Sequence, residues 1–143
     1  DILKVNRKEL TALSGEKDIR RGALKLMRRN PLKLVAVTAG GGDAFLFMED
    51  TTFRYEVPAL GKSFVNSIGA GDTVAGVLIW EYAGGAPPED AFGRALAAGT
   101  ASCASHVPGS FDLGRAEEIA GKIRRITHIS RRLPRSARPR WRP

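Results

Sequence analysis

The stretch FVNSIGAGDTVAG, residues 64–76, constrains the fold of this chain more than any other. An aromatic and a β-branched residue, Phe64 and Val65, predict the end of a strand, and three small residues at 69–71 follow. After Asp72 an apolar helical pattern begins. Small residues let backbone N–H groups approach an anion, and a helix N-terminus adds roughly half a positive charge. The stretch predicts either a tight connection capped by Asp72 or a phosphate cradle with an adjacent base.

Strand and helix patterns alternate along the chain. The predicted strands cover residues 1–5, 33–38, 44–48 and 53–57, and the predicted helices cover 7–14, 19–29, 72–82, 88–105 and 113–123. The run at 33–38 is almost wholly apolar, as is typical of a strand buried on both faces of a parallel sheet. The alternation predicts one α/β domain over residues 1–126, in layers around a largely parallel sheet.

The positive charge lies at the C-terminal end. Of the 23 lysines and arginines that give the net charge of +8, eight are arginines in residues 124–143, a segment without acids. Residues 1–123 are therefore neutral overall. Past Ile126, arginine and proline without an apolar period predict a basic, disordered tail over 127–143. We expect this tail to be a solvated extension rather than a nucleic-acid reader, although its arginines would attract phosphate.

Other features bear on the compartment. Every apolar run is interrupted by charges, so we expect no membrane span, and the N-terminal segment lacks the features of a signal peptide. The single cysteine, Cys103, excludes an internal disulfide. These features predict a cytoplasmic protein without a membrane partner.

Two shorter patterns could take part in a site. Thr38 ends the buried strand, and Gly40, Gly41 and Gly42 follow it, which is typical of a simple turn or of a loop along a ligand. Asn6 precedes Glu9 by three residues, the spacing of a helix capping box. Each pattern therefore has a structural interpretation, as a turn or a helix cap, and a functional one, as part of a binding site.

The three patterns in this order resemble the C-terminal half of the ribokinase-like, or phosphofructokinase-B type, carbohydrate kinases, over about residues 1–124. That resemblance implies a portion of a three-layer α/β/α fold. It also implies roles for individual residues, all of them phosphoryl-transfer roles. The resemblance implies that Asp72 is the catalytic base and that Gly69, Ala70 and Gly71 form the anion hole. It implies further that Thr38 and Gly40 to Gly42 lie along ATP, and that Asn6 and Glu9 hold Mg²⁺ through water.

The resemblance also implies a substrate class and partners. The segments AAGTAS at 97–102 and PGSFDL at 108–113 favour the 1-phosphofructokinase and tagatose-6-phosphate kinase branch. The expected reaction is phosphorylation of a hydroxyl of a sugar or sugar phosphate by ATP, and the complete protein is a possible homodimer. The helix around 97–102 would form one wall of the adenine pocket.

Two departures from the family limit this interpretation. Asp43 stands where the nucleotide loop usually has glycine, and a carboxylate there would repel phosphates unless it turns away. The family's sugar-binding half has no counterpart in residues 1–143, so we expect little activity from this chain alone. The alternative is a non-catalytic nucleotide-binding remnant or interaction module.

Overall fold

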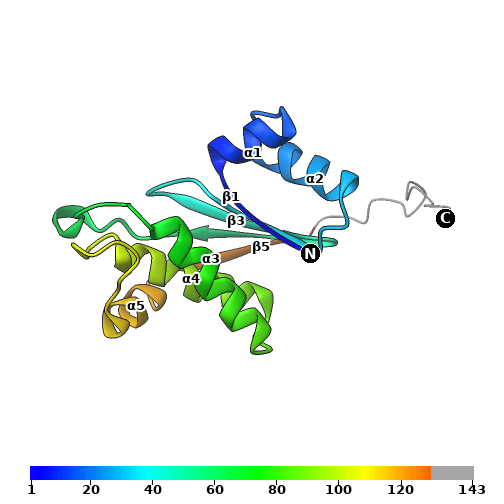
Figure 1. Cartoon of the computed structure of the whole chain (residues 1–143). Helices are drawn as coiled ribbons and strands as arrows, with labels where there is room; N and C mark the ends of the chain where they lie inside the picture. The colour runs from blue at the N-terminus through cyan, green and yellow to red at the C-terminus, as the bar shows by residue number, and fades with distance from the viewer. Residues whose placement is uncertain (130–143) are drawn as a thin grey trace.

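The computed structural model describes residues 1–129, and they form a five-stranded sheet between two layers of helices (Figure 1). The strands are β1 (Ile2–Asn6), β2 (Leu34–Thr38), β3 (Asp43–Met48), β4 (Thr51–Glu56) and β5 (Arg124–Ile129). The helices are α1 (Arg7–Ser14), α2 (Ile19–Arg29), α3 (Ala70–Ala83), α4 (Pro88–Ser102) and α5 (Leu113–Ala120), with a 3₁₀ turn at Gly61–Ser63. The predicted α/β class is confirmed.

The strands lie in the order in which they occur along the chain. β1 and β2 are parallel, whereas β2–β3, β3–β4 and β4–β5 are antiparallel. The largely parallel sheet that we predicted is therefore limited, in this part of the fold, to its first pair. The connections account for most of this: the α1–α2 hairpin joins β1 to β2, while short turns join β2 to β3 and β3 to β4 and permit only antiparallel pairing. β5 reaches the edge of the sheet beside β4 after the long segment that contains α3, α4 and α5.

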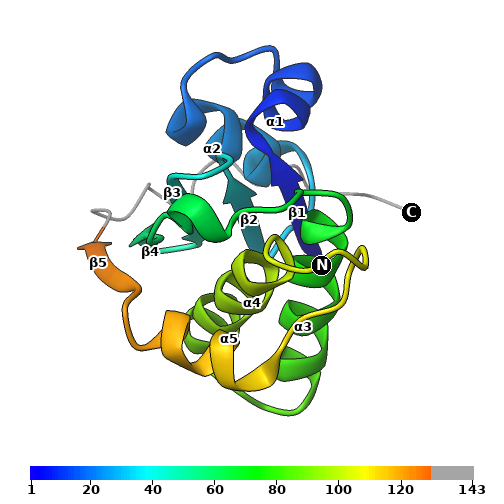
Figure 2. The same cartoon turned by 90° about the vertical axis from the view of Figure 1, so that its left-hand side faces the viewer.

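Each face of the sheet has its own core. On one face, α1 and α2 cover the first strands, with Leu10 and Leu26 packed against Val35 and Phe47. On the other face, α3 and α4 cover β2 to β4. The helical layers and the sheet between them are seen edge-on in Figure 1 and from one end in Figure 2. The segment 34–37 is buried throughout, as its apolar run predicted.

Side-chain caps fix several helix boundaries as the sequence predicted. Asp18 accepts from the Arg21 N–H at 2.7 Å and begins α2, and Asp112 accepts from the Arg115 N–H at 2.7 Å and begins α5. The helix predicted over 113–123 ends earlier, at Ala120, and the one predicted to about residue 105 ends at Ser102.

The last described strand corrects the predicted start of the tail. β5 extends to Ile129, so residues 127–129 pair with β4 rather than belonging to a disordered segment. Arg124 contacts Glu56 at 3.2 Å, and the Arg125 guanidinium lies 5.6 Å from the centre of the Phe53 ring and pairs with Asp90. These partners allow an arginine-rich segment to form a strand. The remainder of the predicted tail, 130–143, lies outside the described residues.

A second correction concerns the segment before α3. Phe64 and Val65 were predicted to end a strand, but they lie in an extended connection without strand pairing. The backbone N–H groups of Val65 and Asn66 instead donate to the Cys103 carbonyl, at 2.8 and 3.2 Å. Within the described part of the chain, none of the helices has the length and apolar character needed to cross a membrane.

Candidate active site

The carboxyl ends of β1 and β2 bring the first two motifs together. Asn6 is the register partner of Thr38 in the parallel pair, so the residue that begins α1 lies beside the residue that begins the glycine loop. Asn6 and Thr38 are both partly exposed. Parallel strands place ligand-binding residues at this edge of a sheet, because all their carboxyl ends meet there.

Asn6 and Glu9 form a complete capping box. The Asn6 side chain accepts from the Glu9 N–H at 2.9 Å, and the Glu9 carboxylate accepts from the Asn6 N–H at 2.7 Å. The structural interpretation of this pair is therefore confirmed, while its role toward Mg²⁺ stays a prediction. Among residues 1–129, no group of three or more His, Cys, Asp or Glu side chains could hold a metal ion directly.

The glycine loop between β2 and β3 leaves room for a ligand. A Cβ added at Gly40, Gly41 or Gly42 would meet no atom within 4 Å. Gly40 has a φ of 84°, which favours glycine, and its carbonyl accepts from the Gly42 N–H at 2.8 Å. Packing therefore requires none of these glycines, and only the turn at Gly40 requires one for its backbone conformation.

Asp43, the residue that departs from the family pattern, is held by Arg54. The Asp43 carboxylate accepts from Arg54 Nε at 3.0 Å and from Arg54 Nη2 at 2.9 Å. Arg54 also contacts Glu56 at 3.5 Å. Because the guanidinium compensates its charge, Asp43 does not present a free carboxylate to the neighbouring glycine loop.

This ion pair yields a testable expectation. Arg54→Met releases the Asp43 carboxylate beside the loop and is expected to weaken ATP binding about two- to threefold, since an exposed charge acts weakly through water. The double variant Arg54→Met/Asp43→Asn should recover the affinity of the unchanged chain. Calorimetric titration measures both, and an Arg54→Met chain that binds ATP as tightly as the unchanged chain would contradict this role.

Gly69 begins α3 in a conformation that only glycine adopts easily. Its φ is 77°, and a Cβ there would lie 2.9 Å from the Gly109 backbone nitrogen. Thr73 stabilises the close contact between Gly69 and Gly109, because its hydroxyl donates to the Gly69 carbonyl at 3.0 Å and lies 3.5 Å from the Gly109 carbonyl. Gly69 therefore allows the loop at 108–109 to pack directly on the start of α3.

The N-terminus of α3 carries the predicted anion hole and base. The Ala70 N–H donates to the Ser67 carbonyl at 3.2 Å, whereas within residues 1–129 no acceptor takes the Gly71 N–H. Asp72 lies in the first turn and is exposed. In the same range its carboxylate has no hydrogen bond or ion pair, so both oxygens are free to accept a proton.

Lys4 is a site residue that sequence reasoning missed. Its ammonium would lie 2.9 Å from a Cβ at Gly71, so glycine at 71 leaves space for this cation over the start of α3. A helix N-terminus already carries partial positive charge, so a lysine placed there favours a bound anion. The available signal was weak: Lys4 stands two residues before Asn6 on the same strand.

Asn66 was also missed. Its amide donates to the Ser105 carbonyl at 3.0 Å and its oxygen accepts from the Ile68 N–H at 2.9 Å. These bonds join the segment before α3 to the segment after α4, and so hold the anion hole in place. The motif residues therefore form a continuous series, in which α3 meets β1 through Lys4 and β1 meets the glycine loop through the pairing of Asn6 with Thr38.

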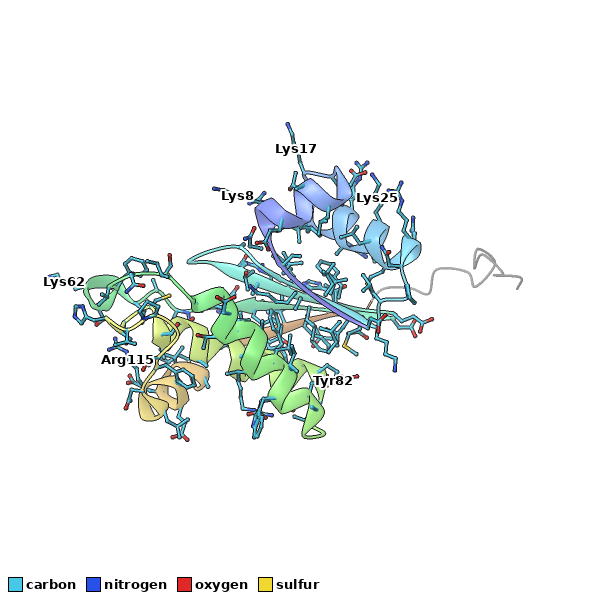
Figure 3. The ribbon with its side chains drawn as sticks, in the orientation of Figure 1. Lys8, Lys17, Lys25, Lys62, Tyr82 and Arg115 are labelled. Atoms are coloured by element: carbon cyan, nitrogen blue, oxygen red, sulfur yellow. The ribbon has the colours of Figure 1, made fainter. Side chains whose placement is uncertain are left out.

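The helix segment 97–102, which was predicted to form one wall of the adenine pocket, is covered by neighbouring helices. Ala97 and Ala101 of α4 pack against Ala116 and Ile119 of α5, and a Cβ at Gly99 would collide with Val74 of α3. Beside α5 there is instead an open hollow of about 630 Å³. It is lined by Pro58, Ala59, Leu60, Ser63, Asp112, Arg115, Glu118, Ile119 and Lys122. Figure 3 shows Lys62 and Arg115 at this end of the molecule, on the side of the glycine loop.

Comparison with known proteins decides the family. Residues 1–112 match the family described as pfkB family carbohydrate kinase, well over half of the chain. This chain belongs to the pfkB carbohydrate kinase family. Curated protein sequences contain no match to it.

Solved structures show that this pfkB family member has the ribokinase-like fold. A Staphylococcus aureus protein described as a phosphofructokinase has a TM-score of 0.78 and 22% identity, over 91% of this chain and 42% of its own. Escherichia coli phosphofructokinase-2, solved with potassium, has a TM-score of 0.72 and 23% identity, over 85% and 40%. Thermotoga maritima ribokinase has a TM-score of 0.74 and 24% identity, over 85% and 42%. The chain thus spans about two fifths of the length of these proteins.

Proposed function

We propose that this chain carries the phosphoryl-transfer part of a sugar kinase site. The reaction is transfer of the terminal phosphoryl group of ATP to a hydroxyl of a sugar or sugar phosphate, with ADP as the other product. The observation that supports it most is the start of α3: within residues 1–129 the Gly71 N–H and the Asp72 carboxylate have no partner, and the Lys4 ammonium lies close to Gly71. Phosphoryl transfer requires this combination of positioning and charge compensation.

Each residue has a role in the proposal. Asp72 accepts the proton of the attacking hydroxyl, and the Gly71 N–H stabilises charge on the transferring phosphoryl oxygens. The predicted anion hole also included Gly69 and Ala70, but the Ala70 N–H donates to the Ser67 carbonyl at 3.2 Å. Lys4 compensates the negative charge of the same group. Thr38 and the glycine loop at 40–42 lie along the remaining phosphates and the ribose. We place the base of the nucleotide in the hollow beside α5, whose volume of about 630 Å³ suits a small ligand.

Asn6 and Glu9 are proposed to hold Mg²⁺ through water. The capping box uses one oxygen of the Glu9 carboxylate and leaves the other available, and oxygen donors suit a cation that dehydrates reluctantly. When bound, the ion would supply positive charge beside the phosphates. The side chains themselves fix the start of α1 and thereby the end of β1.

The proposed substrate class rests on two segments of the sequence. We propose a sugar phosphate, as in 1-phosphofructokinases and tagatose-6-phosphate kinases, because the segments at 97–102 and 108–113 are similar to that branch. A cytoplasmic location and a homodimer of the complete protein stay predictions. For comparison, E. coli phosphofructokinase-2 has a tetrameric inhibited form.

A second candidate is a nucleotide-binding module that transfers nothing. It is favoured by one observation: Asp72 and the glycine loop are open to solvent in residues 1–129, whereas kinase chemistry requires water to be excluded. To separate the two candidates, equilibrium ATP binding is measured together with turnover of fructose 1-phosphate and of tagatose 6-phosphate.

We expect the chain alone to bind ATP and to show little or no turnover, because a sugar is not positioned against Asp72. Turnover should appear when the remaining portion of a pfkB kinase domain is supplied. Ordinary kinase rates from residues 1–143 alone would contradict the incomplete site. If this chain together with that remaining portion binds ATP and the sugar phosphate but transfers no phosphoryl group, the non-catalytic module is favoured.

A further inference from the structure

The charges of residues 1–123 are neutral in sum but unevenly distributed. Residues 7–33, which form α1, α2 and the turns beside them, hold nine lysines and arginines against three acids, a net charge of +6. The other residues of 1–123 hold six lysines and arginines against twelve acids, a net charge of −6. Figure 3 shows Lys8, Lys17 and Lys25 on the layer of α1 and α2, with Lys17 pointing away from the sheet. We call residues 7–33 the basic layer.

The three acids of the basic layer compensate few of its cations. Glu9 and Asp18 accept from backbone N–H groups in helix caps. Glu16 pairs with both Arg21, at 3.4 Å, and Lys25, at 3.1 Å. Six exposed cations of the layer have no acidic partner within residues 1–129: Arg7, Lys8, Lys17, Arg28, Arg29 and Lys33. The layer therefore presents uncompensated positive charge to solvent.

A hollow of about 350 Å³ lies between the starts of α1 and α2 and the strands β3 to β5. Two arginines, a histidine, two phenylalanines and one acid are among the residues that line it: Arg7, Arg20, His128, Phe45, Phe47 and Asp18. The rings of Phe45 and Phe47 are stacked, with centroids 6.2 Å apart, and Phe45 is half-buried. In Figure 2, α2 lies on the same side of the molecule as β3, β4 and β5. The hollow thus adds an aromatic surface to the basic layer.

Cations and an aromatic surface together favour a single nucleic-acid strand as the ligand. Arg21, Lys25 and Arg29 recur every four residues, so they form a row on one face of α2, about 6 Å apart along its axis. Such a row can follow phosphates, and an unpaired base can stack on an aromatic ring or a guanidinium. A lipid surface is a poorer match, because the apolar side of α2, with Ala23 and Leu26, packs in the core and cannot enter a bilayer.

We propose that the basic layer binds single-stranded nucleic acid, with phosphates along its cations and one base in the hollow beside Phe45. This activity is separate from the proposed phosphoryl transfer. The start of α3 does not line this hollow, and the hollow beside α5 is lined by a different set of residues. Its test needs neither ATP nor turnover, so it can fail while the proposed reaction stands, and the reverse.

The experiment measures binding of labelled oligonucleotides to the full chain by fluorescence anisotropy at several salt concentrations. The probes are an oligouridine and an oligothymidine of about 15 nucleotides, a duplex of the same length, and polyglutamate as a competitor. Arg28→Gln/Arg29→Gln removes two charges from the basic layer. Lys62→Gln/Arg94→Gln is the matched control, because both side chains are exposed and lie outside that layer. Thermal melts confirm that each variant is folded.

We expect the chain to bind the single strands with a Kd of roughly 1–100 µM at about 0.1 M salt. Arg28→Gln/Arg29→Gln should weaken binding about five- to twentyfold and make the slope of log K against log salt shallower by about 1.4, since each lost phosphate contact contributes about 0.7. Lys62→Gln/Arg94→Gln should change the affinity by less than about twofold. An equal loss in both double variants would show general attraction by net charge and would overturn the proposal.

Two further variants test where the strand lies. Phe45→Leu keeps an apolar side chain but removes the ring, so it should weaken binding of the strands about threefold or more and leave duplex binding unchanged. Lys4→Met should leave strand binding unchanged, whereas a loss of binding would place the strand in the proposed kinase site. That loss, an unaltered affinity in Phe45→Leu, tighter binding of the duplex, or displacement by an equal charge of polyglutamate would overturn the proposal. Tighter binding of oligouridine than of oligothymidine would support it with RNA as the ligand, and equal binding would support it with either strand.

Discussion

Replacing Asp72 by asparagine is expected to lower kcat by about 10²–10⁴ in a preparation that has turnover, such as the complex with a complementary kinase portion. Asparagine keeps the size of the side chain and cannot accept the proton of the attacking hydroxyl. The side chain is exposed and has no partner within residues 1–129, so its loss breaks no observed contact. ATP affinity should therefore change by less than about twofold, and kcat alone should fall.

The control is Asp50→Asn, which makes the same chemical change in the turn between β3 and β4. It is expected to leave both kcat and ATP affinity unchanged. An unchanged kcat in Asp72→Asn would reject Asp72 as the base. An equal loss in both variants would indicate a general effect of charge rather than proton transfer at one atom.

The second large effect is expected from Gly69→Ala. A side chain at a φ of 77° costs about 1–2 kcal/mol, and its Cβ would press on the Gly109 backbone, which costs about 1–3 kcal/mol more. The free energy of unfolding should fall by about 2–5 kcal/mol, measured by urea denaturation. ATP binding should weaken as well, because the start of α3 must move away from the 108–109 loop.

Gly76→Ala is the matched control, since Gly76 lies in the interior of α3 and a Cβ there meets no atom within 4 Å. That variant is expected to stabilise the chain by about 0.5–1 kcal/mol, because alanine favours a helix over glycine. Gly69→Ala with unaltered stability would show that the loop and α3 do not depend on this close approach.

Sequence reasoning predicted the local features well, because they depend on neighbouring residues. The capping box of Asn6 and Glu9 and the caps at Asp18 and Asp112 are encoded within three residues each. The glycine at the start of α3 is likewise a local signal, since only one residue type adopts its backbone conformation easily. The family and the α/β class followed from the order of these local patterns.

What the sequence did not show depends on contacts between distant elements. The position of Lys4 over Gly71 joins a strand to a helix far along the chain. The Asp43–Arg54 pair follows from the antiparallel register of β3 and β4, which the sequence alone does not determine. Residues 127–129 of β5 were interpreted as tail because no apolar period continues past Ile126, and the partners that hold the start of this strand, Glu56 and Asp90, lie on β4 and α4.

The central claim is that the start of α3, with Lys4, binds the terminal phosphate of a nucleotide. The most direct measurement compares the affinity of this chain for ATP and for AMP, in the unchanged chain and in Lys4→Met. We expect ATP to bind about tenfold more tightly than AMP, because its additional phosphates reach the N–H groups of α3 and the Lys4 ammonium. Lys4→Met should reduce that preference to about twofold or less. Equal affinity for ATP and AMP in the unchanged chain, or a preference that Lys4→Met leaves intact, would contradict the account.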